Sequence, residues 1–138
     1  VHSLARLLSL YNVRLNYVAP DVLRMPEEII EELPRTLPQA QYTTFDEVIS
    51  QTDVLYVTRV QKERFESESV YESVKGTYVI SKETMKLAKE KMIVMHPLPR
   101  VGEISMDVDD DPRAAYFRQM EYGLYVRMAL LAMVLGKA

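Results

Sequence analysis

The chain has 138 residues, 48% of them hydrophobic and 27% charged, which suits a single domain with an ordinary apolar core. The net charge of −3, from 17 basic and 20 acidic side chains, gives no general attraction to nucleic acid or to anionic membranes. The absence of cysteine excludes disulfides, thiolate metal sites and cysteine nucleophiles. The only histidines are His2 and His96, and no carboxylate cluster accompanies them, so we expect no metal site.

The predicted secondary structure alternates between helix and strand along the chain. Leu4, Leu7, Leu8 and Tyr11 recur at helical spacing and predict a first helix. Alternating or continuous apolar residues predict strands at 13–18, 53–57, 77–80 and 92–95. Spacing and end signals predict helices at 2–11, 26–34 and 45–49, a helix capped by Ser81, and a last helix at 113–135.

Besides the helix capped by Ser81, two of these helices have explicit start signals. Pro26 stands at a first helical position and two glutamates follow it, near the positive end of the helix dipole. Asp111 and Pro112 predict a capping residue and a first helical residue for the last helix. The alternation as a whole predicts an α/β fold, a three-layer sandwich with a mainly parallel, doubly wound sheet and a long C-terminal helix, with residues 1–138 as one domain.

Ligands of open α/β sheets bind beyond the carboxyl ends of the strands. The run 53–57 is almost continuously apolar, which predicts a strand covered on both faces. Arg59 follows it and is able to hold a carboxylate with two parallel hydrogen bonds. Gln61 adds an amide nearby. The residues from Lys62 to Arg64 are also what an ordinary solvated loop contains, and their types alone favour that simpler interpretation.

The strand predicted at 92–95 ends in His96-Pro97-Leu98-Pro99-Arg100. Two prolines remove two backbone donors and stiffen this segment, which leaves the carbonyl of Leu98 available to accept a hydrogen bond from a ligand amide. A plain turn with a buried, hydrogen-bonded histidine is an interpretation of equal weight. The sequence leaves open whether the bond between Leu98 and Pro99 is cis.

The remaining candidate motifs predict structure rather than chemistry. Asp107 and the aspartates at 109–111 lack the glycine and the final glutamate of a calcium loop, so we expect a solvated acidic turn. Met120, Met128 and Met133 predict packing. Four glycines supply no phosphate-binding loop. The residue types alone therefore indicate an α/β domain that binds a small anion.

The longest uncharged apolar stretch, 128–136, falls well short of the ~20 residues that span a bilayer. The first residue is Val1, and no signal-peptide pattern follows it. We expect a cytoplasmic protein without membrane or nucleic-acid partners, whose sequence begins as if cut from a longer polypeptide.

One segment resembles a known family closely. His96 to Val101, with Glu103 and Ile104, resembles the H-P-L-P-R-V-x-E-I signature of aspartate carbamoyltransferases. Ornithine carbamoyltransferases, which share the fold, carry cysteine where this chain has Pro97 and use an S-M-G loop that is absent here. Further segments extend the resemblance over the whole chain: Val1–Leu4, Thr58–Arg64, Asp111–Gln119 and Gly123–Arg127.

The resemblance implies an activity and its binding residues. In this family the amine of L-aspartate attacks carbamoyl phosphate in pyrimidine biosynthesis, without a cofactor. Arg59 matches the arginine that clamps an aspartate carboxylate, and Gln61 matches a neighbouring aspartate contact. Leu98 and Pro99 match the stiff loop whose backbone meets the carbamoyl group. Arg127 matches an arginine near the active site.

The resemblance also implies what is missing. Lys62 and Arg64 match residues that form salt bridges when two domains close. The Gly-Arg-Thr that precedes the segment matching Val1 and the S-T-R-T-R carbamoyl-phosphate motif are absent. We therefore expect the aspartate-binding half of the enzyme, without its carbamoyl-phosphate domain and inactive alone. The parent is expected to be a homotrimer, most like the C-terminal part of eukaryotic multifunctional pyrimidine-synthesis proteins.

Two further expectations concern this half-enzyme. The last helix would lack its packing partner, which predicts an exposed apolar patch near Ala129–Leu135 and self-association. The alternative hypothesis is a non-catalytic binding or interaction domain on the same fold. Tight aspartate binding without carbamoyl phosphate would favour that alternative.

Overall fold

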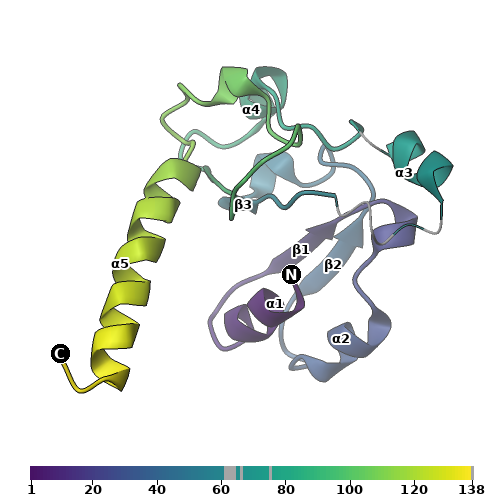
Figure 1. Ribbon diagram of the computed structural model, residues 1–138. Coiled ribbons are helices and arrows are strands. Elements are labelled where there is room, and N and C mark those ends of the chain that lie inside the picture. Colours follow the sequence, from purple (N-terminus) through teal and green to yellow (C-terminus); the bar gives the residue numbers. More distant parts are fainter. Residues whose placement is uncertain (61–64, 66, 75, 138) are drawn as a thin grey trace. The chain divides into compact units, whose positions relative to one another are not determined.

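The computed structural model describes residues 1–60, 65, 67–74 and 76–137 (Figure 1). The chain divides into two compact units, Val1–Val48 and Ile49–Ala138, and each is considered by itself. Gln61, Lys62 and Arg64 lie outside the described residues.

The first unit pairs two short parallel strands beside two helices. Helix α1 (His2–Leu8) is followed by β1 (Leu15–Val18), α2 (Glu27–Glu32) and β2 (Gln39–Tyr42). The strands are in parallel register, from the pair Leu15 with Gln39 to the pair Val18 with Tyr42. The buried core of this unit consists of Ala5, Met25, Ile29, Leu33 and Leu37.

Strand β2 was absent from the predicted elements because its sequence, Gln-Ala-Gln-Tyr, is short and contains no large aliphatic or β-branched side chain. Its glutamines are half-buried and hydrogen-bonded instead. The Gln39 amide donates to the Ile30 carbonyl over 3.1 Å, and the Gln41 side-chain oxygen accepts from the Met25 backbone N–H over 2.9 Å. Tertiary hydrogen bonds thus stabilise a strand that side-chain polarity alone does not indicate.

The first two predicted helices of the first unit are present, but their ends differ from the predicted ones. Helix α1 ends at Leu8, three residues before the predicted end. Pro26 is the N-cap of α2 rather than its first residue, and α2 ends at Glu32 because Leu33, before Pro34, adopts an extended conformation. The predicted helix at 45–49 is a turn followed by a 3₁₀ segment at Ile49–Gln51.

The second unit contains the parallel pair β3 (Val54–Tyr56) and β4 (Ile93–Met95), in register from Val54 with Ile93 to Tyr56 with Met95. Its helices are α3 (Glu68–Val74), α4 (Lys82–Leu87) and the long α5 (Tyr116–Val134). Fully buried side chains from these elements and the loops between them form its core: Ile80, Met85, Met92, Val94, Ile104, Val108 and Tyr116. Parallel strands, α/β order and a long C-terminal helix confirm the predicted fold class.

Several local predictions for this unit were wrong. Residues 77–80 form no strand; only Ile80 pairs, in a bridge to Ile104. Strand β3 is not covered on both faces, because Val54 and Tyr56 are exposed. Helix α5 begins at Tyr116 rather than at 113, since Arg113 lies in a turn and Ala114 forms a bridge with Val94.

The N-cap assigned to Ser81 is confirmed. Its hydroxyl accepts from the Thr84 backbone N–H, and the Thr84 hydroxyl accepts from the Ser81 N–H in return, forming a capping box. Asp111, predicted to cap the last helix, instead accepts from the Arg113 backbone and guanidinium within a turn. Over the part of the chain with described coordinates, no helix is long and apolar enough to cross a membrane.

Candidate functional site

Among the predicted site residues, Arg59, Leu98 and Pro99 follow two adjacent strands of the second unit. Because β3 and β4 run parallel, with Tyr56 opposite Met95, their carboxyl ends meet at one edge of the pair. The Val57 N–H donates to the Met95 carbonyl over 2.9 Å and continues the pairing past β3. Arg59 lies exposed just beyond this edge, and the loop from His96 to Arg100 leaves the same edge.

His96 is almost fully buried, with 1% of its surface exposed, and both ring nitrogens are hydrogen-bonded. The Leu98 backbone N–H donates to Nδ1 over 2.8 Å, and Nε2 lies 2.7 Å from Oε1 of Glu103. The His96 backbone N–H donates to the Gln119 side-chain oxygen of α5 over 2.9 Å. His96 is therefore buried and fully hydrogen-bonded, a feature that one of the two interpretations of this segment included.

Glu103 is the second buried member of this arrangement, with 8% of its side chain exposed. Its Oε2 accepts from the backbone N–H groups of Val101, over 3.2 Å, and of Gly102, over 3.1 Å. Burial by itself would raise the pKa of this carboxyl. The backbone N–H groups and His96 outweigh burial and hold the pKa of Glu103 below its ordinary value.

Leu98 occupies an uncommon backbone conformation, with φ of 45°. A left-handed conformation costs a non-glycine residue roughly 1–3 kcal/mol, so neighbouring contacts must hold it. The bond between Leu98 and Pro99 is cis. Leu98 is half-buried, while Pro97 and Pro99 are exposed. The two residues predicted to contact the carbamoyl group, Leu98 and Pro99, thus lie in a loop with an uncommon backbone conformation at the strand edge.

Arg100 fixes the far end of this loop. Its guanidinium forms a two-pronged ion pair with Asp109, in which Nη2 lies 2.6 Å from Oδ2. The Tyr116 hydroxyl donates to Oδ1 of Asp109 over 2.5 Å. Tyr116 is fully buried, and burial together with its bond to Asp109 raises its pKa to about 12. Arg100 also lies 5.6 Å from the centre of the Tyr116 ring.

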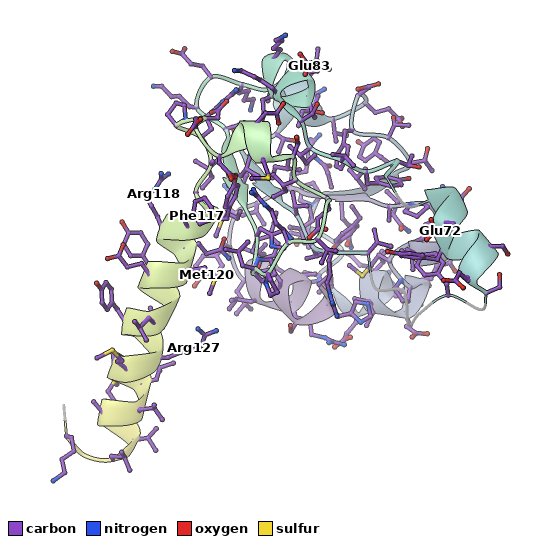
Figure 2. All side chains as sticks on the ribbon, turned by 45° about the horizontal axis from the view of Figure 1, so that its top comes forward. Glu72, Glu83, Phe117, Arg118, Met120 and Arg127 are labelled. Carbon is purple, nitrogen blue, oxygen red and sulfur yellow. The ribbon has the colours of Figure 1, made fainter. Side chains whose placement is uncertain are left out.

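Arg127 lies on α5, two helical turns beyond Gln119. Gln119 is the residue whose side chain accepts from the His96 backbone N–H. Its side chain is exposed and projects from the same side of the helix as Met120 (Figure 2). Helix α5 therefore connects the His96 loop to Arg127 through one continuous element. The structure does not test the substrate contacts assigned to Arg59, Leu98, Pro99 and Arg127, which stay predictions.

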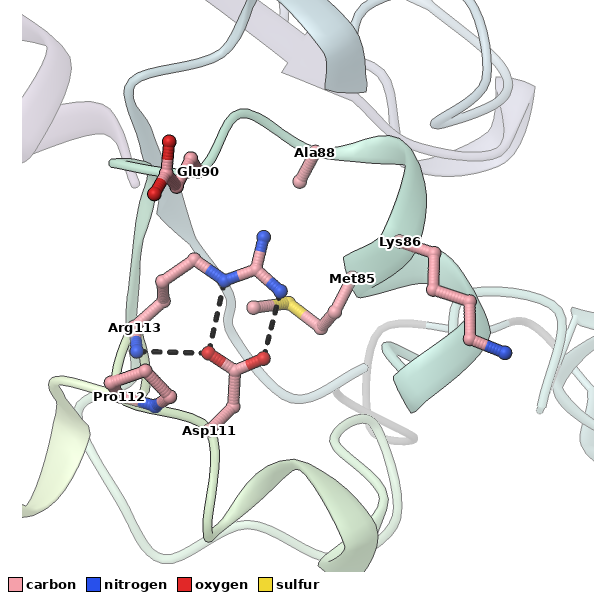
Figure 3. A pocket seen from close by; sticks show the side chains of 7 residues that line it. All are labelled: Met85, Lys86, Ala88, Glu90, Asp111, Pro112 and Arg113. Atoms are coloured by element: carbon pink, nitrogen blue, oxygen red, sulfur yellow. Dashed lines mark hydrogen bonds and ion pairs between the residues drawn. The ribbon is translucent and has the colours of Figure 1, made fainter.

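A separate depression of about 440 Å³ lies between α4 and the turn before α5 (Figure 3). Its charged lining is largely paired, because Arg113 Nη2 lies 2.7 Å from Oδ2 of Asp111 and Nη1 donates to the Lys89 carbonyl. It shares no residue with the predicted site. No group of three or more acidic or histidine side chains that could hold a metal ion occurs among the residues described.

Sequence reasoning missed the polar supports of the loop: Glu103, Asp109, Tyr116 and Gln119. His96 and Glu103 are seven residues apart in irregular backbone, where no periodicity indicates that they meet. The available signal was the signature itself, in which the glutamate stands at a fixed distance from the histidine.

Comparison with known proteins agrees with this arrangement. Residues 1–134 match the family "Aspartate/ornithine carbamoyltransferase, Asp/Orn binding domain". The multifunctional protein CAD of Squalus acanthias is 58% identical over 138 residues, which cover 99% of this chain and 6% of that protein. The catalytic subunit of M. jannaschii aspartate transcarbamoylase superposes with a TM-score of 0.89 at 47% identity, covering 99% of this chain and 45% of that one.

A second solved structure is aspartate transcarbamoylase from Trypanosoma cruzi in complex with carbamoyl phosphate and aspartate. It is 44% identical with a TM-score of 0.82, and the match covers 94% of this chain and 42% of that chain. The present chain thus spans less than half the length of these solved relatives. With a family match over almost its full length and relatives at this identity, the chain belongs to the aspartate/ornithine carbamoyltransferase family, in which it corresponds to the Asp/Orn-binding domain.

Proposed function

We propose that this chain is the aspartate-binding part of an aspartate carbamoyltransferase. The amine nitrogen of L-aspartate attacks the carbonyl carbon of carbamoyl phosphate, the bond from that carbon to the phosphate oxygen breaks, and the amine loses a proton. The observation that carries this proposal is the parallel pairing of β3 with β4, which brings Arg59 and the Leu98–Pro99 loop to one edge.

Each predicted site residue has a distinct task in the proposal. Arg59 holds an aspartate carboxylate in a two-pronged ion pair, and Gln61 binds the same substrate. The backbone at Leu98 and Pro99 orients the carbamoyl group. Arg127 adds positive charge near the reacting atoms. Catalysis then consists of positioning and charge stabilisation, which needs no cofactor from this chain.

A carbamoyl-phosphate domain is the partner that the proposal requires. From Leu124 onward, α5 and the residue that follows it carry large apolar side chains that are all exposed: Leu124, Val126, Met128, Leu130, Leu131, Met133, Val134 and Leu135. Apolar surface of this extent is typical of a contact with another protein surface. We infer that the carbamoyl-phosphate domain covers it, and that Lys62 and Arg64 form salt bridges as the two domains close.

Three further elements of the proposal rest on the family resemblance alone. They are homotrimeric assembly of the parent enzyme, a cytoplasmic location and a place in pyrimidine biosynthesis. Sedimentation of the parent enzyme tests the first of them.

The proposal is tested by assaying carbamoyl aspartate formation with this chain alone and after mixing with a separately produced carbamoyl-phosphate domain. We expect product only in the mixture. Arg59→Ala should lower kcat/KM for aspartate on the order of 100-fold, because it removes one partner of a desolvated ion pair. Arg14→Ala, a change at an exposed arginine of the first unit, is the control and should leave activity unchanged.

The alternative of a non-catalytic binding domain gives a different result. A folded chain that binds aspartate tightly without carbamoyl phosphate, and forms no product in either condition, would favour that alternative and remove the catalytic proposal.

A further inference from the structure

A chain of buried polar contacts leads from Glu103 through the His96 ring to the backbone of Leu98. Oε1 of Glu103 lies 2.7 Å from Nε2, and Nδ1 lies 2.8 Å from the Leu98 nitrogen. We propose that His96 and Glu103 are a positioning pair that fixes the Leu98 backbone against the carbamoyl group. This inference rests on the proposed function, since it assigns a support to that site rather than a new site.

The contacts determine which ring nitrogen carries the proton. The Leu98 backbone N–H is a donor, so Nδ1 of His96 must offer a lone pair, and the ring proton of the neutral form resides on Nε2. From there it is donated to the Glu103 carboxylate. In the opposite tautomer Nδ1 would carry the proton, and its N–H would face the backbone N–H of Leu98 with no acceptor between them. Glu103 therefore selects the tautomer that holds the Leu98 backbone.

Burial separates this pair from direct chemistry. The side chains of His96 and Glu103 are 1% and 8% exposed, so neither reaches a substrate in the open edge beyond β3 and β4. Their effect passes through the backbone. The second oxygen of Glu103 accepts from the N–H groups of Val101 and Gly102, so one carboxylate holds the loop beyond Leu98 as well.

The loop needs such a support because its central residue is in a left-handed conformation, with φ of 45° at Leu98. Its two ends are tied to other elements, by Gln119 to the His96 N–H and by Asp109 to Arg100. Those hydrogen bonds do not hold the backbone conformation in the middle of the loop. The hydrogen bond from the Leu98 N–H to the His96 ring holds it there.

Nuclear magnetic resonance of the ¹⁵N-histidine-labelled chain tests the tautomer without any activity. The sequence has only two histidines, so His96→Gln assigns the signals by leaving His2 alone. We expect one ring protonated at Nε2 and unprotonated at Nδ1 at neutral pH. A His96 ring protonated at Nδ1 would overturn the proposal.

Two substitutions separate the contacts of His96. In His96→Asn the side-chain oxygen replaces Nδ1 and keeps an acceptor for Leu98, whereas in His96→Gln the amide nitrogen replaces Nε2 and keeps a donor to Glu103. We expect slow amide exchange of Leu98 in the unchanged chain and in His96→Asn, and faster exchange in His96→Gln. Equal Leu98 exchange in all three would contradict the proposal.

The kinetic arm uses the chain mixed with its carbamoyl-phosphate domain. His96→Gln should lower kcat on the order of tenfold to a hundredfold through misplacement of the loop, with a smaller loss in His96→Asn. Val108→Ala, a cavity in the same unit, controls for lost stability and should leave kcat of the folded fraction unchanged. Equal kcat in all variants would refute the positioning role. Absence of product even from the unchanged protein would refute the proposed function. The nuclear magnetic resonance and amide-exchange results would still test whether His96 holds the Leu98 backbone.

Discussion

The two ends of α5 differ in composition and in environment, since Arg127 is the one charged residue of the C-terminal half. At the N-terminal end Tyr116 is fully buried and bonds to Asp109, and Gln119 bonds to the backbone of His96. In the C-terminal half the large apolar side chains are exposed, up to 83% at Val134. The predicted exposed patch near the end of this helix is confirmed. One end of the helix thus belongs to the core of its unit, and the other presents a surface for a partner.

The largest expected effect comes from the buried end. Tyr116→Ala removes a fully buried ring and a hydrogen bond, and should lower the free energy of unfolding by about 3–5 kcal/mol. Phe117→Ala removes the neighbouring ring, which is 54% exposed, and should cost about 1 kcal/mol. Urea denaturation of both variants measures the difference. Equal losses would contradict the contrast between a packed residue and an exposed one.

A smaller effect is expected at Asp109, which links Arg100 to Tyr116. Asp109→Asn removes the charge from these hydrogen bonds and should cost about 1–3 kcal/mol at neutral pH. Arg100 holds the pKa of Asp109 below its ordinary value, so the unfolded chain binds the proton more readily. This contribution is complete above the unfolded pKa of about 3.9 and is lost as pH falls through the lower folded value.

Thermal unfolding across pH checks this sign. The unchanged chain and Asp109→Asn should differ at neutral pH and converge in acid. A difference that does not shrink as the pH falls from neutral into the acid range would mean that Asp109 acts through something other than its charge.

The smallest effect on folding is expected at the exposed end. Leu131→Glu changes a residue that is 63% exposed and should alter the free energy of unfolding by no more than about 0.5 kcal/mol. It should nevertheless weaken self-association of the chain and its binding to a carbamoyl-phosphate domain. Lys137→Glu alters charge near the same end without removing apolar surface and serves as the control. Sedimentation at high concentration measures the self-association. If the unsubstituted chain sediments as a monomer, the predicted self-association is contradicted.

The predictions from sequence succeeded where a structural feature depends only on residues that are close together in the sequence. Ser81 caps α4 because a hydroxyl in that position satisfies a helix N–H, and this requires no distant partner. Strand β3 was found from its apolar run, but its exposure depends on which elements cover it, which the run does not encode. The start of α5 was displaced because Ala114 pairs with Val94, a contact between residues twenty positions apart.

The candidate site divides in the same way. Arg59 and Leu98 were placed at strand ends by the general rule for α/β sheets, and the structure places both beyond the β3 and β4 edge. Their roles as ligands of aspartate and of the carbamoyl group came from the resemblance, not from spacing. The support of Leu98 by Glu103 could not be predicted from the sequence, because the two residues are linked through the buried His96 ring only in the folded structure.

The most direct test of the central claim is a choice between amino-acid substrates. The chain, combined with a carbamoyl-phosphate domain, is supplied with carbamoyl phosphate and equal amounts of L-aspartate and L-ornithine, and both carbamoylated products are measured. The account predicts carbamoyl aspartate alone, with its formation lost in Arg59→Ala. Carbamoylated ornithine as the main product would contradict it and would place this chain in the other branch of its family.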